Sequence, residues 1–200
     1  MPAKRTKTKI KRRNNRPKLT PGKAVHVRPN LGFVVVGLVL ILSTVVYRFY
    51  DIRRLSFAAS ADQLTITAHT QAPAKTIRLP KRFVTLDIVQ TAIVDGVWQI
   101  HDTVANHLDI SANPGEGGNI VIYGHNSTEV FGPLRWMSIG EEIEITGSDD
   151  VVHTYIVDKI VETNPDDITW ILPKATETLT LYTCSGLLNT KRHIVIAHPI

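Results

Sequence analysis

Residues 180–197 read TLYTCSGLLNTKRHIVIA, which is two strand-like runs separated by a turn. Side chains along a β-strand alternate between its two faces, so residues two apart share a face. Leu179 and Leu181 therefore lie on one face of the first run, and Cys184 lies at its end on the opposite, more polar face. We expect the leucines to point into the core of a mainly β fold.

The chain after residue 75 repeats this pattern. Short runs rich in β-branched residues alternate with Gly, Pro, Asn and Asp turns, as in a β-sandwich or β-barrel. The predicted strands are residues 76–79, 83–94, 119–123, 142–146, 151–163, 178–183 and 193–197. Residues 151–163 are long for one flat strand, so we expect this strand to bend or bulge. Short helical turns are predicted at residues 103–108 and 131–137.

The charge is concentrated at the N-terminus. Residues 1–30 contain 11 of the 23 Lys and Arg residues and none of the 18 Asp and Glu residues. Such a basic tail suits either nucleic acid or anionic lipid headgroups. No aromatic residues are interleaved with the cations, and an apolar segment follows directly, so we predict contact with a membrane and no nucleic-acid binding.

Residues 31–47, LGFVVVGLVLILSTVVY, carry no charge. At about 1.5 Å per residue they cover most of the roughly 30 Å hydrocarbon core of a bilayer. With the flanking aromatic residues, they predict a transmembrane helix at residues 31–50. The positive-inside rule places the tail in the cytoplasm and residues 51–200 outside. The alternatives are a cleaved signal peptide, whose candidate site at Ala59-Ser60-Ala61 lies far downstream, and a buried core helix.

Cys184 is the chain's one cysteine, so it cannot form an intramolecular disulfide. It is either an apolar core residue or a reactive thiol. A reactive thiol needs a group that favours or uses the thiolate. Of the eight histidines, His125 is the best candidate, because it follows Gly124 at the end of the apolar run 119–123. The alternative is a structural histidine.

Arg192 begins the last predicted strand, after the turn that starts at Ser185-Gly186. It can therefore face Cys184 across neighbouring strand ends. A guanidinium keeps its charge and offers a planar set of donors, which suits it to bind an oxyanion. The alternative is a solvated surface arginine.

Together these residues resemble the sortase family of cysteine transpeptidases. The resemblance lies in an ordered set of motifs, and it puts the family's cysteine, histidine and arginine at Cys184, His125 and Arg192. The matching stretches are IRLPK at 77–81, SANPGEGGNIVIYGH at 111–125, FGPL at 131–134, GEEI at 140–143 and TLYTC at 180–184.

The resemblance implies a closed eight-stranded sortase-type β-barrel with short helices. The predicted organisation is a basic cytoplasmic tail (1–30), a transmembrane anchor (31–50), a stalk (51–74) and a catalytic domain (75–200). The resemblance also implies cleavage of a Leu-Pro-x-Thr-Gly-like sorting signal through a thioacyl-enzyme.

In that reaction Cys184 is the nucleophile, His125 the acid and base, and Arg192 the oxyanion ligand. The implied partners are exported proteins with a C-terminal sorting signal and an amine acceptor, either a cell-wall precursor or a pilin lysine. We predict no cofactor and no metal site. Two alternatives remain: a catalytically idle, membrane-anchored barrel that binds peptides or scaffolds envelope proteins, and a cysteine peptidase that only hydrolyses.

Overall fold

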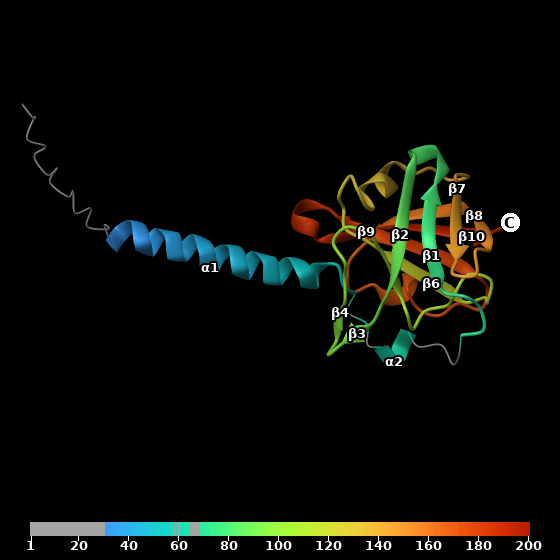
Figure 1. Ribbon diagram of the computed structural model, residues 1–200, viewed down its shortest axis with the longest axis horizontal. Helices are drawn as coiled ribbons and strands as arrows, with labels where there is room; N and C mark the ends of the chain where they lie inside the picture. Colours follow the sequence, from blue (N-terminus) through green and yellow to red (C-terminus); the bar gives the residue numbers. More distant parts are fainter. Residues whose placement is uncertain (1–30, 58, 60, 65–68) are drawn as a thin grey trace, which may run out of the picture. The chain divides into compact units, whose positions relative to one another are not determined.

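The structure, a computed structural model, describes residues 31–57, 59, 61–64 and 69–200 (Figure 1). The predicted basic tail, residues 1–30, lies outside the described residues. The chain divides into two units, Met1–Ile41 and Leu42–Ile200. All of the β-structure among the described residues lies in the second unit.

Helix α1 (Leu31–Arg54) contains the apolar run. Its described side chains, from Gly32 to Tyr47, are mostly large apolar groups exposed on the helix surface. In the part of the chain that the structure describes, no helix meets the length and hydropathy required to cross a membrane. A second, four-residue helix, α2 (Ala61–Leu64), follows.

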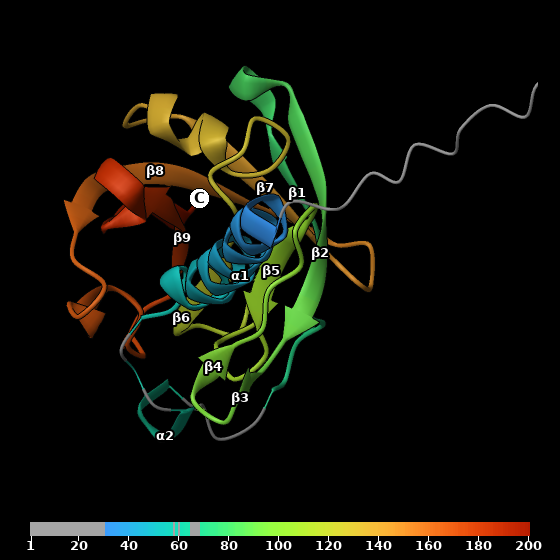
Figure 2. The same ribbon diagram turned by 90° about the vertical axis from the view of Figure 1, so that its left-hand side faces the viewer.

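Eight strands form a closed barrel in the order β1-β2-β5-β6-β9-β10-β8-β7 (Figures 1 and 2), which confirms the predicted eight-stranded barrel. Their bounds are β1 Ala74–Leu79, β2 Val84–Thr91, β5 Ala105–Leu108, β6 Asn119–Tyr123, β7 Glu142–Gly147, β8 Val152–Thr163, β9 Thr178–Ser185 and β10 Lys191–Pro199. A separate two-stranded hairpin, β3 (Ile93–Val94) and β4 (Val97–Trp98), lies between β2 and β5 in sequence. The short 3₁₀ helices are η1 Pro80–Arg82, η2 Gly132–Trp136, η3 Ile168–Trp170 and η4 Leu187–Asn189.

Of two further predictions about local structure, one is confirmed and one is wrong. The long strand β8 does bulge: Ile196 and Ala197 of β10 pair with Lys159 and Val157, which leaves Asp158 between them. The helical turn predicted at residues 103–108 is wrong, because β5 occupies most of that segment. All four residues of β5 are buried, so this short polar strand shows no alternation of exposed and buried positions.

Most neighbouring strands are antiparallel, but β6 and β9 are parallel and pair from Asn119 with Thr178 to Tyr123 with Tyr182. Parallel neighbours end at the same edge of a sheet. The residues that follow β6 therefore lie at the same edge of the barrel as the end of β9. This single pairing determines where the candidate site lies.

The barrel carries apolar clusters on both of its surfaces. The inner cluster fills the barrel and includes Leu179 and Leu181, which confirms that the leucines point into the core. The outer cluster covers the outside of β6, β9 and β10 and includes Cys184. The prediction of a more polar face there was wrong, because Leu55 and Phe57 from the segment after α1 are buried against it.

Candidate active site

Cys184 lies near the end of β9, directly opposite Arg192 of β10 in the antiparallel register. Both side chains are buried, with exposed fractions of 5% for Cys184 and 1% for Arg192. The interpretation of Arg192 as a solvated surface residue is therefore wrong. The two predicted residues are cross-strand neighbours, as the sequence suggested.

A cleft of about 350 Å³ opens at this end of the barrel. Two of the three predicted site residues, Cys184 and His125, line it. The complete lining is Leu55, Asp102, His125, Asn126, Ser127, Cys184 and Asn189. The cleft thus brings together a thiol and an imidazole from the ends of β9 and β6, whose paired residues, such as Ile120 and Leu179, lie 59 positions apart in the sequence.

The strand exit at Gly124 fixes the backbone of His125. The Gly124 N–H donates to the Tyr182 carbonyl at 3.2 Å, and the Thr183 hydroxyl donates to the Gly124 carbonyl at 2.7 Å. A Cβ on residue 124 would lie 2.7 Å from Val130 Cγ1, so glycine is required at this close approach. The chain just before His125 is thereby bound to the strand that carries Cys184.

Arg192 donates its hydrogen bonds to backbone carbonyls. Nη1 donates to Asn189 at 3.3 Å and to Lys191 at 3.0 Å, and Nη2 donates to Ser56 at 2.9 Å. The guanidinium lies 5.8 Å from the centroid of the Phe57 ring. Burial lowers the pKa of Arg192, but the ordinary pKa of a guanidinium is so far above neutral that the group stays charged.

One donor of this guanidinium has no protein acceptor. Arg192 Nε is buried and has no hydrogen-bond partner among the described residues. A buried N–H without a partner costs free energy, and native proteins rarely leave one. The arrangement therefore offers a fixed cationic donor beside Cys184 that an oxygen of a ligand could satisfy.

The other histidines have different surroundings. Among the histidines that the structure describes, His125 is the one that lines the cleft. His107 is fully buried in β5, where Nε2 lies 3.0 Å from the Ala112 carbonyl, and burial lowers its pKa to about 4. His69 lies 3.0 Å from the Glu116 carboxylate, and His193 lies 3.1 Å from the Leu134 carbonyl. Each of these three has a structural contact away from Cys184.

Sequence reasoning did not identify five of the lining residues, which are Leu55, Asp102, Asn126, Ser127 and Asn189. Asp102 lies just before the segment 103–108 that was wrongly predicted to be helical, and its Oδ1 lies 3.1 Å from His125 Nε2. Asn189 lies in η4, after Cys184. Leu55 belongs to the predicted stalk. The apolar residues Leu55 and Phe57 could have indicated that this part of the stalk packs against the barrel.

Within the described ranges, no three His, Cys, Asp or Glu side chains are grouped so that they could hold an ion. The chemistry that these groups offer is acyl transfer: a thiol nucleophile, an imidazole for proton transfer and a guanidinium for an oxyanion.

Comparisons with known proteins identify the family to which this chain is similar. A family model of the Sortase domain matches residues 77–200. Comparison with curated proteins finds no match. Sortase C1 from Streptococcus suis is a similar solved structure, with 25% identity and a TM-score of 0.54 over 64% of this chain and 73% of that chain.

Two further solved structures are similar to a comparable degree. Sortase A from Corynebacterium diphtheriae, a lid mutant, shows 28% identity and a TM-score of 0.52, over 66% of this chain and 72% of that chain. A sortase D5 transpeptidase from Clostridium perfringens shows 25% identity and a TM-score of 0.54, over 68% of this chain and 82% of that chain.

Proposed function

Because the chain belongs to the sortase family of cysteine transpeptidases, we propose that it cleaves a Leu-Pro-x-Thr-Gly-like sorting signal between Thr and Gly and transfers the acyl group to an amine. The observation that carries this proposal is the parallel pairing of β6 with β9. It supports a joint role for His125 and Cys184, since both line one cleft.

The proposed reaction has two steps. The Cys184 thiolate attacks the threonine carbonyl carbon, and the C–N bond then breaks to give a thioacyl-enzyme and an amine that takes a proton from His125. In the second step an incoming amine attacks the thioester, gives a proton to His125 and releases the Cys184 thiolate. Arg192 stabilises the oxyanion that develops in both steps.

The substrates in this proposal are exported proteins that end in a sorting signal. The acceptor amine is a cell-wall precursor or a pilin lysine, and both acceptors present a primary amine to the same thioester. The alternative of an idle barrel is less well supported, because an idle barrel has no need for a thiol, an imidazole and a buried guanidinium around one cleft.

We further propose that residues 31–50 anchor the enzyme in the cell membrane, with the tail in the cytoplasm and the catalytic domain outside. The support is the uncharged run 31–47, the 11 cations before it and the exposed apolar side chains along α1. An anchor would hold the enzyme at the surface where exported substrates emerge.

The test uses the full chain in detergent micelles with a fluorogenic sorting peptide and a soluble amine such as triglycine. We expect a peptide–triglycine product, and a thioacyl adduct on Cys184 by mass spectrometry when the amine is omitted. A Cys184→Ala variant should form neither, while His198→Gln, which changes a half-buried histidine outside the cleft, should behave as wild type. Hydrolysis without the triglycine product would indicate a peptidase, and no adduct with any sorting peptide would support the idle barrel.

A further inference from the structure

Asp102 contacts the imidazole of His125. Its Oδ1 lies 3.1 Å from His125 Nε2, and both side chains line the cleft. An ionised carboxylate has acceptors but no donor, so the hydrogen bond runs from Nε2–H to Asp102. A histidine that donates from Nε2 in its neutral form has its lone pair on Nδ1.

The segment that carries Asp102 is tied to the strand that leads to His125. Asn106 of β5 is fully buried. Its Oδ1 accepts a hydrogen bond from the His101 N–H at 2.7 Å, and its Nδ2 donates to the His101 and Val104 carbonyls at 3.3 Å. The same Nδ2 lies 3.3 Å from the carbonyl of Tyr123, two residues before His125.

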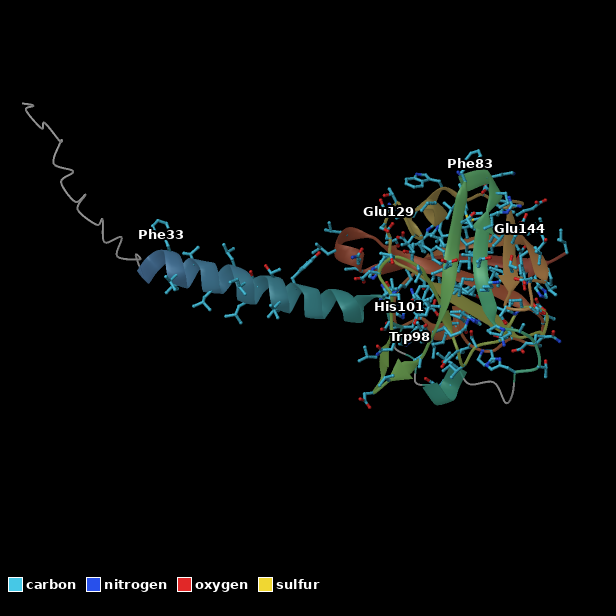
Figure 3. The ribbon with its side chains drawn as sticks, viewed as in Figure 1. Phe33, Phe83, Trp98, His101, Glu129 and Glu144 are labelled. Atoms are coloured by element: carbon cyan, nitrogen blue, oxygen red, sulfur yellow. The ribbon has the colours of Figure 1, made fainter. Side chains whose placement is uncertain are left out.

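One buried amide therefore connects both sides of the Asp102–His125 pair. It closes the turn 101–104 and also binds the end of β6. Figure 3 labels His101, the residue before Asp102, at the edge of the barrel. A carboxylate on an unrestrained loop would hold the ring weakly, but the amide of Asn106 fixes the backbone on both sides of the contact.

The exposure of the pair argues against a role in folding. The Asp102 side chain is 71% exposed and that of His125 is 27% exposed. Exposed ion pairs contribute little to stability, because water screens them and the side chains lose conformational freedom. A base oriented by a third group is, in contrast, the recurring arrangement around catalytic nucleophiles.

We propose that Asp102 is a positioning residue that fixes the ring orientation and the tautomer of His125, so that Nδ1 is the nitrogen that exchanges protons with substrate amines. This inference rests on the proposed transpeptidase function. The proton on Nδ1 passes to the leaving amine as the C–N bond breaks, and Nδ1 takes a proton from the incoming amine as the new amide forms. Nε2 keeps its proton throughout and donates it to the Asp102 carboxylate.

The first measurement is the tautomer of His125 in the full chain, by ¹⁵N NMR in detergent micelles after selective histidine labelling. A His125→Gln sample assigns the signal. In its neutral form, the wild-type ring should show Nε2–H with an unprotonated Nδ1. Asp102→Ala should shift the signals toward a mixture of the two tautomers. An unchanged tautomer in Asp102→Ala would overturn the inference, whether or not the enzyme turns over a peptide.

The second measurement separates kcat from KM in sorting-peptide turnover. Asp102→Ala should lower kcat by about 10- to 100-fold, which is less than the 10² to 10⁴ that a general acid–base group contributes itself, and should leave KM within about threefold. Asp102→Glu keeps a carboxylate and should recover part of kcat. The matched control is Asp158→Ala, because Asp158 forms another solvent-exposed carboxylate–histidine contact, 3.7 Å from His198 and outside the cleft.

The outcomes are distinct. If wild type and Asp158→Ala are active and Asp102→Ala keeps kcat within twofold, the positioning role is wrong and the proposed function stands. If wild type acts on no sorting peptide, the proposed function is wrong, and the NMR measurement still decides the orientation of His125.

Discussion

At the scale of single residues, the buried guanidinium of Arg192 restricts what can replace it. Its two terminal nitrogens donate to three backbone carbonyls, which holds the plane of the group at a fixed angle beside Cys184. A positive charge could stabilise the Cys184 thiolate from many positions around it, because this effect depends on distance and not on direction. Oxyanion binding needs a donor in a fixed direction, so the arginine geometry itself should matter.

We therefore expect Arg192→Lys to lose about 10² to 10³ in kcat, close to the loss in Arg192→Ala, because lysine has no planar set of donors. Steady-state turnover of a sorting peptide measures this. The alkylation rate of Cys184 at neutral pH serves as a control for thiolate content, and it should fall less in Lys than in Ala. Turnover of the lysine variant within a few-fold of wild type would mean that charge suffices.

A second residue, His107, should make the fold sensitive to acid. Burial lowers its pKa to about 4, from an ordinary value of 6.5. The unfolded chain therefore takes up a proton near pH 6.5, whereas the folded chain does so near pH 4. The contribution of His107 to the free energy of unfolding is therefore complete above pH 6.5 and is lost as the pH falls from 6.5 to 4. Below this window the free energy of unfolding is lower by roughly 3 kcal/mol.

Denaturant unfolding of the full chain at a series of pH values between 7.5 and 4 checks this expectation. A His107→Gln variant, which cannot titrate, should show a flatter dependence over the same window. Equal slopes in the two proteins would assign the acid sensitivity to carboxylates such as Glu116. Burial raises the pKa of Glu116, but its hydrogen bonds with backbone N–H groups and with His69 outweigh burial, so that its pKa is lowered overall.

How far sequence predicts a site depends on how its residues are held. Cys184 and Arg192 could be predicted because their facing positions follow from two strands joined by a short turn. His125 could be predicted as a strand-end residue after a glycine. Asp102 could not, because its contact with His125 depends on a hydrogen bond from the buried Asn106, and no local pattern encodes that bond.

At the scale of elements, the turn between β1 and β2 contains an unfavourable residue. Phe83 follows η1 with φ 54° and ψ 34°, in the left-handed region, and its side chain is 97% exposed (Figure 3). A left-handed conformation costs an L-residue roughly 1–2 kcal/mol. An exposed ring recovers little of that cost by packing.

Replacing Phe83 with Asn should therefore stabilise the protein by about 0.5–1 kcal/mol, because asparagine tolerates this conformation. In a protein of this size the melting temperature should rise by roughly 1–4 °C, as measured by circular dichroism. Phe83→Ala, which removes the ring but keeps a Cβ on a left-handed backbone, should gain less. A lower melting temperature in Phe83→Asn would show that the ring makes a stabilising contact.

The strands themselves were predictable to different extents. Runs such as 119–123 and 142–146 have the β-branched composition that favours strands, and they form β6 and β7. Strand β5 was missed because Ala105, Asn106 and His107 are poor strand formers in isolation. They adopt a strand because β2 and β6 pair with them on both sides. The parallel pairing of β6 with β9 is likewise a tertiary property that no local pattern encodes.

At the scale of the whole molecule, charge separates the chain into two parts. Residues 1–30 hold 11 cations and no anions, whereas the other 170 residues hold 12 cations and 18 anions. The positive-inside rule concerns such an asymmetry around an apolar segment. It is the basis for the proposed orientation, with the barrel outside the cell.

Protease added to intact protoplasts should therefore digest the chain after Tyr50 and leave an N-terminal fragment that contains the basic tail. Immunoblotting with separate epitopes at the two ends measures this. As a control, permeabilised cells should lose both epitopes. Protection of the C-terminal epitope in intact protoplasts would contradict the orientation, and a mature N-terminus near Asp62 would indicate signal-peptide cleavage.

The two apolar clusters have a consequence for how this protein tolerates mutation. The inner cluster contains none of the three proposed catalytic residues, whereas the outer cluster includes Cys184 and Phe57, and the Phe57 ring centroid lies 5.8 Å from the Arg192 guanidinium. In a mutational scan that records protein abundance and turnover separately, substitutions at positions such as Ile122 or Leu181 should change both in proportion. Substitutions on the outer cluster, for example at Ile194, should change turnover at constant abundance more often. Interior substitutions should therefore leave the turnover per folded molecule unchanged, so that the interior of the barrel can diverge in sequence while the chemistry on its outer surface stays the same.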